Sequence, residues 1–98
     1  VVDLIRELQG WNVNVVVFDP WADPAEVQHE YGIALSPAGQ LPPVDSLVVA
    51  VGHKEFRELS PQTLRSYCKP ASRPVIGDLK SLFDRQALDA AGFTVFRL

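Results

Sequence analysis

Hydrophobic and polar residues follow two patterns along the chain, one typical of helices and one typical of buried strands. In residues 1–9 the apolar side chains recur with helical spacing, and Arg6, Glu7 and Gln9 lie on the opposite side. This spacing predicts an amphipathic helix. Residues 47–51 are apolar without interruption and rich in valine. A strand with one wet face would alternate with polar residues, so this run predicts a strand buried on both faces, as in parallel sheets.

Three more helices are predicted from the residues that begin them. Each has a side chain suited to cap a helix, and two have proline at the first helical position. The caps are Asp23, Ser60 and Asp84, and the prolines are Pro24 and Pro61. Around the second and third caps, hydrophobic pairs can pack as staples, Leu59 with Leu64 and Phe83 with Leu88. We expect these helices to end near Tyr31, near Cys68 and before Gly92.

Apolar segments between the helices predict the strands of a sheet. They are residues 13–18, 33–35, 46–51, 74–77 and 93–96. Strands that alternate with helices favour a parallel sheet with right-handed crossovers. The predicted fold class is therefore α/β, a Rossmann-like three-layer parallel sheet with helices on both faces. Residues 36–43, rich in proline, are expected to form a surface loop, and residues 1–98 a single domain.

Composition and charge exclude several classes of function. Apolar residues make up 47% of the chain and charged residues 21%, which is typical of a folded globular domain. The net charge of −3 gives no electrostatic reason to expect nucleic acid or an anionic membrane as a partner. The only cysteine, Cys68, rules out an internal disulfide and favours a reducing compartment, the cytoplasm. His29, His53 and Cys68 have no metal-ligand spacing, so no metal is expected.

Polar residues that follow the predicted strands are the candidate binding residues. In open α/β sheets, ligands bind outside the carboxyl ends of the strands. His53 follows the strand at 46–51, where it can donate to a ligand or shuttle a proton. Asp78 and Lys80 follow the next strand, and a lysine there can meet a phosphate as a point charge. Asp19 ends the first predicted strand, where dinucleotide folds often hold a ribose.

Each candidate also has an ordinary structural explanation. Asp19 precedes a proline and can bond to the backbone of a turn. His53 and Lys80 can be solvated surface residues. Cys68 is expected at the C-terminal end of its helix, the wrong end to lower the pKa of a thiol, which favours a structural role. The residues alone indicate a parallel α/β domain with a polar rim for an anionic small ligand.

Two functions without catalysis stay open at this point. One is a Rossmann-like regulatory or assembly module whose polar rim binds nothing. The other is a response-regulator-like domain, for which Lys80 would suit the lysine after the last long strand. The acidic cluster that such a domain needs after its first strand is not visible in the sequence. No glycine-rich phosphate loop of the dinucleotide or P-loop type is present either.

Short motifs distributed over nearly the whole chain point to a family. They are VDLIREL at 2–8, FDPWADP at 18–24, HEYGI at 29–33, HKEF at 53–56, GDLK at 77–80, LFDR at 82–85, GF at 92–93 and RL at 97–98. In their order and spacing they resemble the C-terminal, UDP-binding domain of the UDP-glucose/GDP-mannose dehydrogenase family. The resemblance is nearest to the bacterial UDP-N-acetylhexosamine 6-dehydrogenases of surface-polysaccharide synthesis.

This resemblance implies a function for the protein that carries the chain. Members of the family oxidise the C6 hydroxyl of a UDP-sugar to a carboxylate in two NAD-dependent steps. It implies that NAD binds to an N-terminal domain of the parent protein, a homo-oligomer, and that this chain helps to bind UDP. Lys80 falls at the family position near the nucleotide sugar, with Asp78 before it, and His53 lies in a matching motif. The family's catalytic cysteine lies in a glycine-rich motif that the residues around Cys68 do not match.

The chain also departs from the family pattern. The resemblance places the domain's first strand, and the basic loop that supplies much of the UDP contact, before Val1. In the strand order 3-2-1-4-5-6 that strand is the central one. We therefore expect residues 13–18 and 46–51 either to pair directly or to recruit a strand from another chain. We also expect this fragment alone to lack dehydrogenase activity and to bind UDP weakly or not at all.

Overall fold

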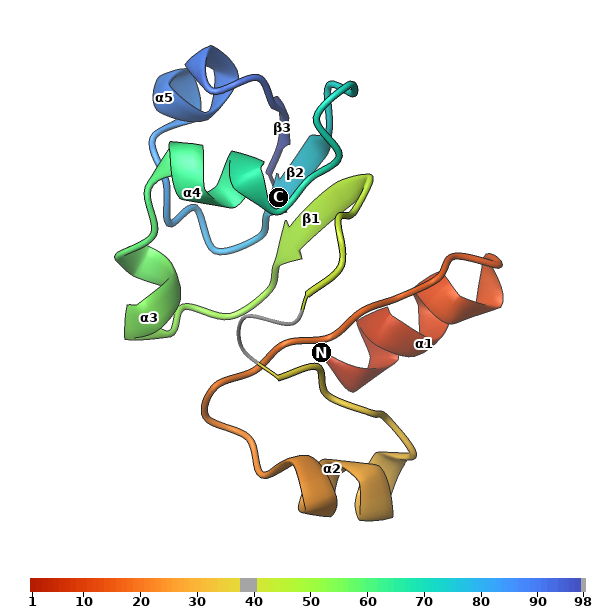
Figure 1. Cartoon of the computed structure of the whole chain (residues 1–98). Helices are drawn as coiled ribbons and strands as arrows, with labels where there is room; N and C mark the ends of the chain where they lie inside the picture. The colour runs from red at the N-terminus through yellow and green to blue at the C-terminus, as the bar shows by residue number, and fades with distance from the viewer. Residues whose placement is uncertain (38–40, 98) are drawn as a thin grey trace. The chain divides into compact units, whose positions relative to one another are not determined.

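The chain has an α/β fold in a computed structural model that describes residues 1–37 and 41–97 (Figure 1). It divides into two compact units, Val1–Leu41 and Pro42–Leu98. The first unit contains α1 (Val2–Gly10) and α2 (Pro24–Tyr31). The second contains, in order, β1 (Ser46–Val49), α3 (Lys54–Arg57), α4 (Pro61–Ser66), β2 (Val75–Asp78), α5 (Arg85–Ala90) and β3 (Thr94–Phe96). Among the described residues, no helix has both the length and the hydrophobicity needed to span a bilayer.

The sheet of the second unit has three parallel strands in the order β1-β2-β3. Its register places Leu47 opposite Ile76, and Ile76 opposite Val95. Right-handed crossovers between strands added in the same direction bring both crossover helices to one face of the sheet. The predicted α/β class, with a parallel sheet flanked by helices, is confirmed.

The core of the second unit lies between the sheet and the helices α4 and α5. Ile76 of β2 and Leu88 of α5 are completely buried, as is Phe93. Leu64 of α4 and Phe83 belong to the same cluster. Burying a large apolar side chain stabilises a fold by about 1.5–3 kcal/mol, so this cluster is the main source of stability for the sheet.

The other face of the same sheet is open and apolar. Successive side chains of a strand point to opposite faces, so the residues that alternate with the core residues lie there. Val48, Val75 and Phe96 are 49%, 43% and 54% exposed. Val48 and Phe96 flank Gly77 in one row across the three strands. The second unit therefore has one covered sheet face and one face with exposed hydrophobic side chains.

The three predicted helix starts are confirmed. In each case the cap side chain accepts backbone N–H groups of the first turn: Asp23 from Ala25 and Glu26, Ser60 from Thr63, and Asp84 from Ala87. Gly32 ends α2 in the left-handed conformation, with φ of 67°, which glycine adopts at little cost. The short helix α3 is not predicted by the sequence patterns, and α4 ends two residues earlier than expected, at Ser66.

The prediction of a strand at residues 13–18 is wrong. In the described part of the first unit, β pairing is limited to one parallel bridge between Val17 and Leu35, in which the Ser36 N–H donates to the Val17 carbonyl over 2.8 Å. The strand predicted at 33–35 is reduced to the same bridge. A strand is stable only when neighbours extend its ladder, and a single bridge supplies no ladder. The prediction that residues 13–18 pair with β1 or recruit another strand stays a prediction.

Candidate functional site

The carboxyl ends of β1 and β2 meet at one edge of the sheet, because the two strands are parallel neighbours. The Leu79 N–H donates to the Val49 carbonyl over 3.1 Å, so the two chains stay together as the strands end. Further along, Gly52 lies against Leu82, since a Cβ added to Gly52 would be 3.6 Å from Leu82 Cδ2. The turn that leads to His53 is therefore beside the loop formed by residues 79–83. We call these two segments together the rim.

Asp78 anchors the loop of residues 79–83 by hydrogen bonds from the end of β2. It is the last residue of β2, and its side chain is fully buried. Its Oδ1 accepts the Leu82 N–H over 2.9 Å, and its Oδ2 accepts the Phe83 N–H over 3.0 Å. A buried carboxylate needs such donors to offset the water that it has lost. Asp78 was predicted as a binding residue, and in this geometry it acts on the loop that carries Lys80.

Arg97 contacts both Asp78 and the loop that Asp78 anchors. Its Nη2 lies 3.9 Å from Asp78 Oδ2 and also donates to the Phe83 carbonyl. The guanidinium partly compensates the charge of the buried carboxylate. Within the loop, Ser81 has a φ of 51°, in the left-handed region that non-glycine residues rarely occupy. The loop is thus held at both ends in one conformation. The sequence patterns gave no reason to connect Arg97 with Asp78, 19 positions earlier.

Lys80 and His53 are the two predicted binding residues that belong to the rim, and they differ in exposure. Lys80 lies two residues beyond β2 and is exposed, and no hydrogen bond or ion pair within the described part of the chain engages its ammonium group. His53 caps α3 and is half-buried, with its ring 5.5 Å from that of Phe56 at an interplanar angle of 38°. Arg57 Nε donates to the Gly52 carbonyl over 3.1 Å and fixes the turn before His53. The rim therefore has a backbone fixed by hydrogen bonds and carries one exposed cationic side chain, Lys80.

The remaining two candidates have structural roles in the geometry observed. Asp19 belongs to the first unit, and its Oδ1 accepts the Trp21 N–H over 2.9 Å, which is the turn interaction that was its alternative explanation. Cys68 is buried just after α4. Burial raises the pKa of its thiol, and the nearby Arg65 guanidinium opposes this only in part. A thiol with a raised pKa stays protonated at neutral pH and is a poor nucleophile.

The rim does not fit a dinucleotide. A Rossmann phosphate site needs several glycines between a strand and the start of a helix, so that the backbone can approach the pyrophosphate. The turn after β1 has Gly52 alone, and the loop of residues 79–83 has no glycine. In the described parts of the chain, moreover, no group of three or more His, Cys, Asp or Glu side chains could hold a metal ion. The rim can instead offer a few polar contacts to an anionic group.

Comparison with known proteins decides the family. Residues 1–85 match the UDP binding domain of the UDP-glucose/GDP-mannose dehydrogenase family. The chain belongs to that family. It is 37% identical over 89 residues to the UDP-N-acetyl-D-glucosamine 6-dehydrogenase of Pseudomonas aeruginosa, a match that covers 91% of this chain and 21% of the relative. The protein of the same name from Salmonella typhi is 33% identical over 89 residues, with 91% of this chain and 20% of the relative covered.

Membership of the UDP-glucose/GDP-mannose dehydrogenase family confirms the resemblance drawn from the sequence motifs. The matched residues 1–85 contain both segments of the rim and the start of α5. The chain spans about a fifth of the length of the curated relatives it matches. Its match is to the UDP binding domain of that family.

Proposed function

We propose that this chain is the part of an NAD-dependent UDP-sugar 6-dehydrogenase that holds the UDP end of the substrate. The observation that carries the proposal is the loop of residues 79–83, which Asp78 and Arg97 fix beside the turn at Gly52. The family match to a UDP-binding domain and the names of the two relatives support it.

In this proposal Lys80 and His53 contact the ligand, and Asp78 positions the loop that carries Lys80. The Lys80 ammonium would meet a phosphate oxygen as a point charge with three donors. His53 would donate a hydrogen bond to UDP from the neighbouring turn. Asp78, completely buried, would act through the loop that it anchors. A charge-assisted hydrogen bond of this kind contributes about 1.5–3 kcal/mol to binding.

The chemistry of the parent enzyme lies outside this chain in the same proposal. NAD, which accepts hydride when bound, would be held by another domain, because the rim described here does not fit its pyrophosphate. The chain itself would orient the substrate and have no dehydrogenase activity on its own. We further propose that the parent enzyme is a cytoplasmic homo-oligomer that makes UDP-uronic acids for polysaccharide synthesis.

Calorimetric titration of the full-length protein with UDP tests the role of the rim. Lys80→Ala is expected to weaken UDP binding by at least about tenfold, because one charge-assisted contact is lost. Lys69→Ala is the matched control. Lys69 is also an exposed lysine, but its Nζ lies 3.2 Å from Asp45 Oδ1, and its N–H bonds to Val44 before the amino end of β1. Equal UDP affinities for Lys80→Ala and the unmodified protein would overturn the proposal.

A non-catalytic assembly module is the second candidate, and the open sheet face favours it. Val48, Val75 and Phe96 present exposed apolar side chains on that face. Patches of this kind commonly mark contacts with another protein segment. For this alternative, UDP titrations would give no heat, while sedimentation would show an assembly that dissociates when Phe96 is replaced by a charged residue.

A further inference from the structure

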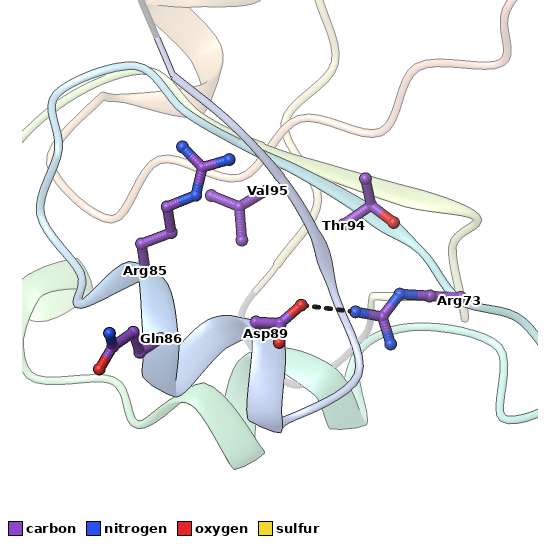
Figure 2. A pocket seen from close by; sticks show the side chains of 6 residues that line it. All are labelled: Arg73, Arg85, Gln86, Asp89, Thr94 and Val95. Atoms are coloured by element: carbon purple, nitrogen blue, oxygen red, sulfur yellow. Dashed lines mark hydrogen bonds and ion pairs between the residues drawn. The ribbon is translucent and has the colours of Figure 1, made fainter.

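A groove lies between α5 and β3, and none of the residues that line it belongs to the rim (Figure 2). Its volume is about 510 Å³, within the usual range of small-ligand sites. The residues that line it are Arg73, Arg85, Gln86, Asp89, Thr94 and Val95. It is bounded by α5 on one side and by the last strand of the sheet on the other.

The groove carries positive charge in a chain that is acidic overall. Its two arginines and one aspartate give a net charge of +1, whereas the whole chain has −3. Arg73 Nη2 donates to Asp89 Oδ1 over 2.8 Å and to the Phe93 carbonyl over 2.9 Å. A guanidinium has five N–H donors, so the donors on Nη1 and Nε of Arg73 remain for a ligand. Arg73 is therefore fixed in place and still able to bind an anion.

Arg85 supplies a second cation at the other end of the groove. Figure 2 shows the Arg73 and Arg85 side chains on either side of Val95. Arg85 is the first residue of α5 and is exposed, and within residues 1–37 and 41–97 its side chain takes part in no ion pair or hydrogen bond. An exposed arginine that lines a groove suits the planar, two-point recognition of a carboxylate or phosphate.

The backbone of β3 adds a donor between the two arginines. The Thr94 N–H bonds to the Pro74 carbonyl over 2.9 Å, so the amide groups of Thr94 face β2. Along a strand, the amide groups of the next residue point the opposite way. The N–H and carbonyl of Val95 therefore point away from β2, and β3 is the last strand of the sheet on that side. Val95 is itself one of the residues that line the groove.

We propose that this groove binds the oxyanion of a small ligand, a carboxylate or a phosphate, between Arg85, Arg73 and the Val95 N–H. The three donors come from a helix, a loop and an edge strand that border the same groove. The site is separate from the rim proposed for UDP, because it lies outside β3 and uses neither Lys80 nor His53. It adds a second anion-binding function to this part of the molecule.

The test is an NMR titration of the ¹⁵N-labelled full chain with inorganic phosphate and, separately, with succinate, at constant ionic strength. The Val95 amide is expected to shift in a saturable way with at least one of the two probes, and the probe that does so tells phosphate from carboxylate. Arg85→Gln should raise the dissociation constant by about tenfold, the cost of one charge-assisted contact. Arg85 is exposed, so this change leaves the core intact.

Two controls keep the outcome interpretable. Arg6→Gln removes the same charge from the first unit, where Arg6 donates to the Tyr31 carbonyl, and should leave the Val95 titration unchanged. Lys80→Ala should also leave it unchanged, although it is expected to weaken UDP binding, so the two sites can fail independently. No saturable shift of Val95 with either probe, or equal affinities for Arg85→Gln and the unmodified chain, would overturn the proposal.

Discussion

The two units of the chain differ in how much of their structure depends on residues far apart in sequence. The second unit has a three-strand sheet and a cluster of buried side chains contributed by strands and helices. In the described part of the first unit, the buried hydrophobic residues are Ile5 and Ile33, and the β structure is the single bridge from Val17 to Leu35. The same kinds of local sequence signal occur in both units. The difference shows that local signals make helices, while a sheet needs partners.

The largest expected difference between the two units is in how the stability of the sheet responds when one buried isoleucine of each unit is replaced. Ile76→Ala is expected to lower the free energy of unfolding of the second unit by about 3 kcal/mol, from lost burial and the cavity left behind. Native-state hydrogen exchange at the β2 amides measures this change. Val75→Ala, at the neighbouring exposed position, is the control and should cost less than about 1 kcal/mol.

The same exchange measurement on Ile33→Ala tests the contrast itself. Ile33 is buried in the first unit, so this change should leave the β2 amides protected as before. If Ile33→Ala lowered their protection as much as Ile76→Ala does, the two units would unfold as one block, and the comparison would fail.

The next largest expected effect is the loss of stability when Asp78, which anchors the loop of the rim, is replaced. Asp78→Asn is expected to lower the free energy of unfolding by about 2 kcal/mol, because one of the two accepting oxygens becomes an NH2 donor that faces a backbone N–H, and the charge that pairs with Arg97 is lost. Urea denaturation measures the loss. Asp84→Asn is a matched control, since asparagine caps a helix about as well as aspartate. Equal losses for the two variants would contradict the role given to Asp78.

Replacing the residues that cap helices should cause a smaller loss of stability, of similar size in the two units. Asp23→Ala in the first unit and Ser60→Ala in the second are each expected to cost about 1 kcal/mol of helix stability. Backbone chemical shifts of α2 and α4 report the fraying directly. The comparison predicts that both effects stay local to their helices. Loss of the β1-β2 pairing in Asp23→Ala would show that the caps are not independent of the sheet.

The smallest effect is the pH dependence caused by Cys68. Burial raises the pKa of the folded thiol above its ordinary value of 9.0, so the unfolded chain loses this proton at a lower pH than the folded chain. The unfolded state then binds fewer protons, and stability falls as the pH rises from about the ordinary pKa through the folded one. Cys68→Ala should flatten that slope in urea titrations. The rate at which Cys68 reacts with a disulfide reagent at pH 8 can be compared for the folded chain and the chain unfolded in urea. Equal rates would contradict the burial of the thiol.

The parts of the fold that could be predicted from sequence are those with local causes. Caps, staples and glycine stops locate α2, α4 and α5 closely, because each signal acts within one turn of helix. The strands of the second unit were also located to within about two residues, since each has a parallel neighbour. The segment 13–18 has an equally apolar pattern, but its pattern says nothing about whether a partner strand is present. That is why the same reasoning succeeded for β1 and failed there.

The candidate site likewise has features that could be predicted from the sequence and features that could not. His53 and Lys80 could be predicted as candidates because they come shortly after strands, a rule that depends only on order along the chain. The role of Asp78 in anchoring the loop, and the pairing with Arg97, depend on contacts made only after the sheet has formed. The groove beside β3 was missed for the same reason, since Arg73 precedes β2 and Arg85 begins α5, and the two come to line one groove only when α5 packs beside β3.

The one-sided sheet of the second unit predicts how this chain tolerates change over evolution. Strand positions that face α4 and α5 should accept few substitutions, and the positions between them should be free to vary if solvent is all that they meet. A saturation mutagenesis scan would then show tolerance that alternates residue by residue along β1 and β3. Uniform intolerance at Val48, Val75 and Phe96 would instead reveal that another protein surface occupies that face in the cell.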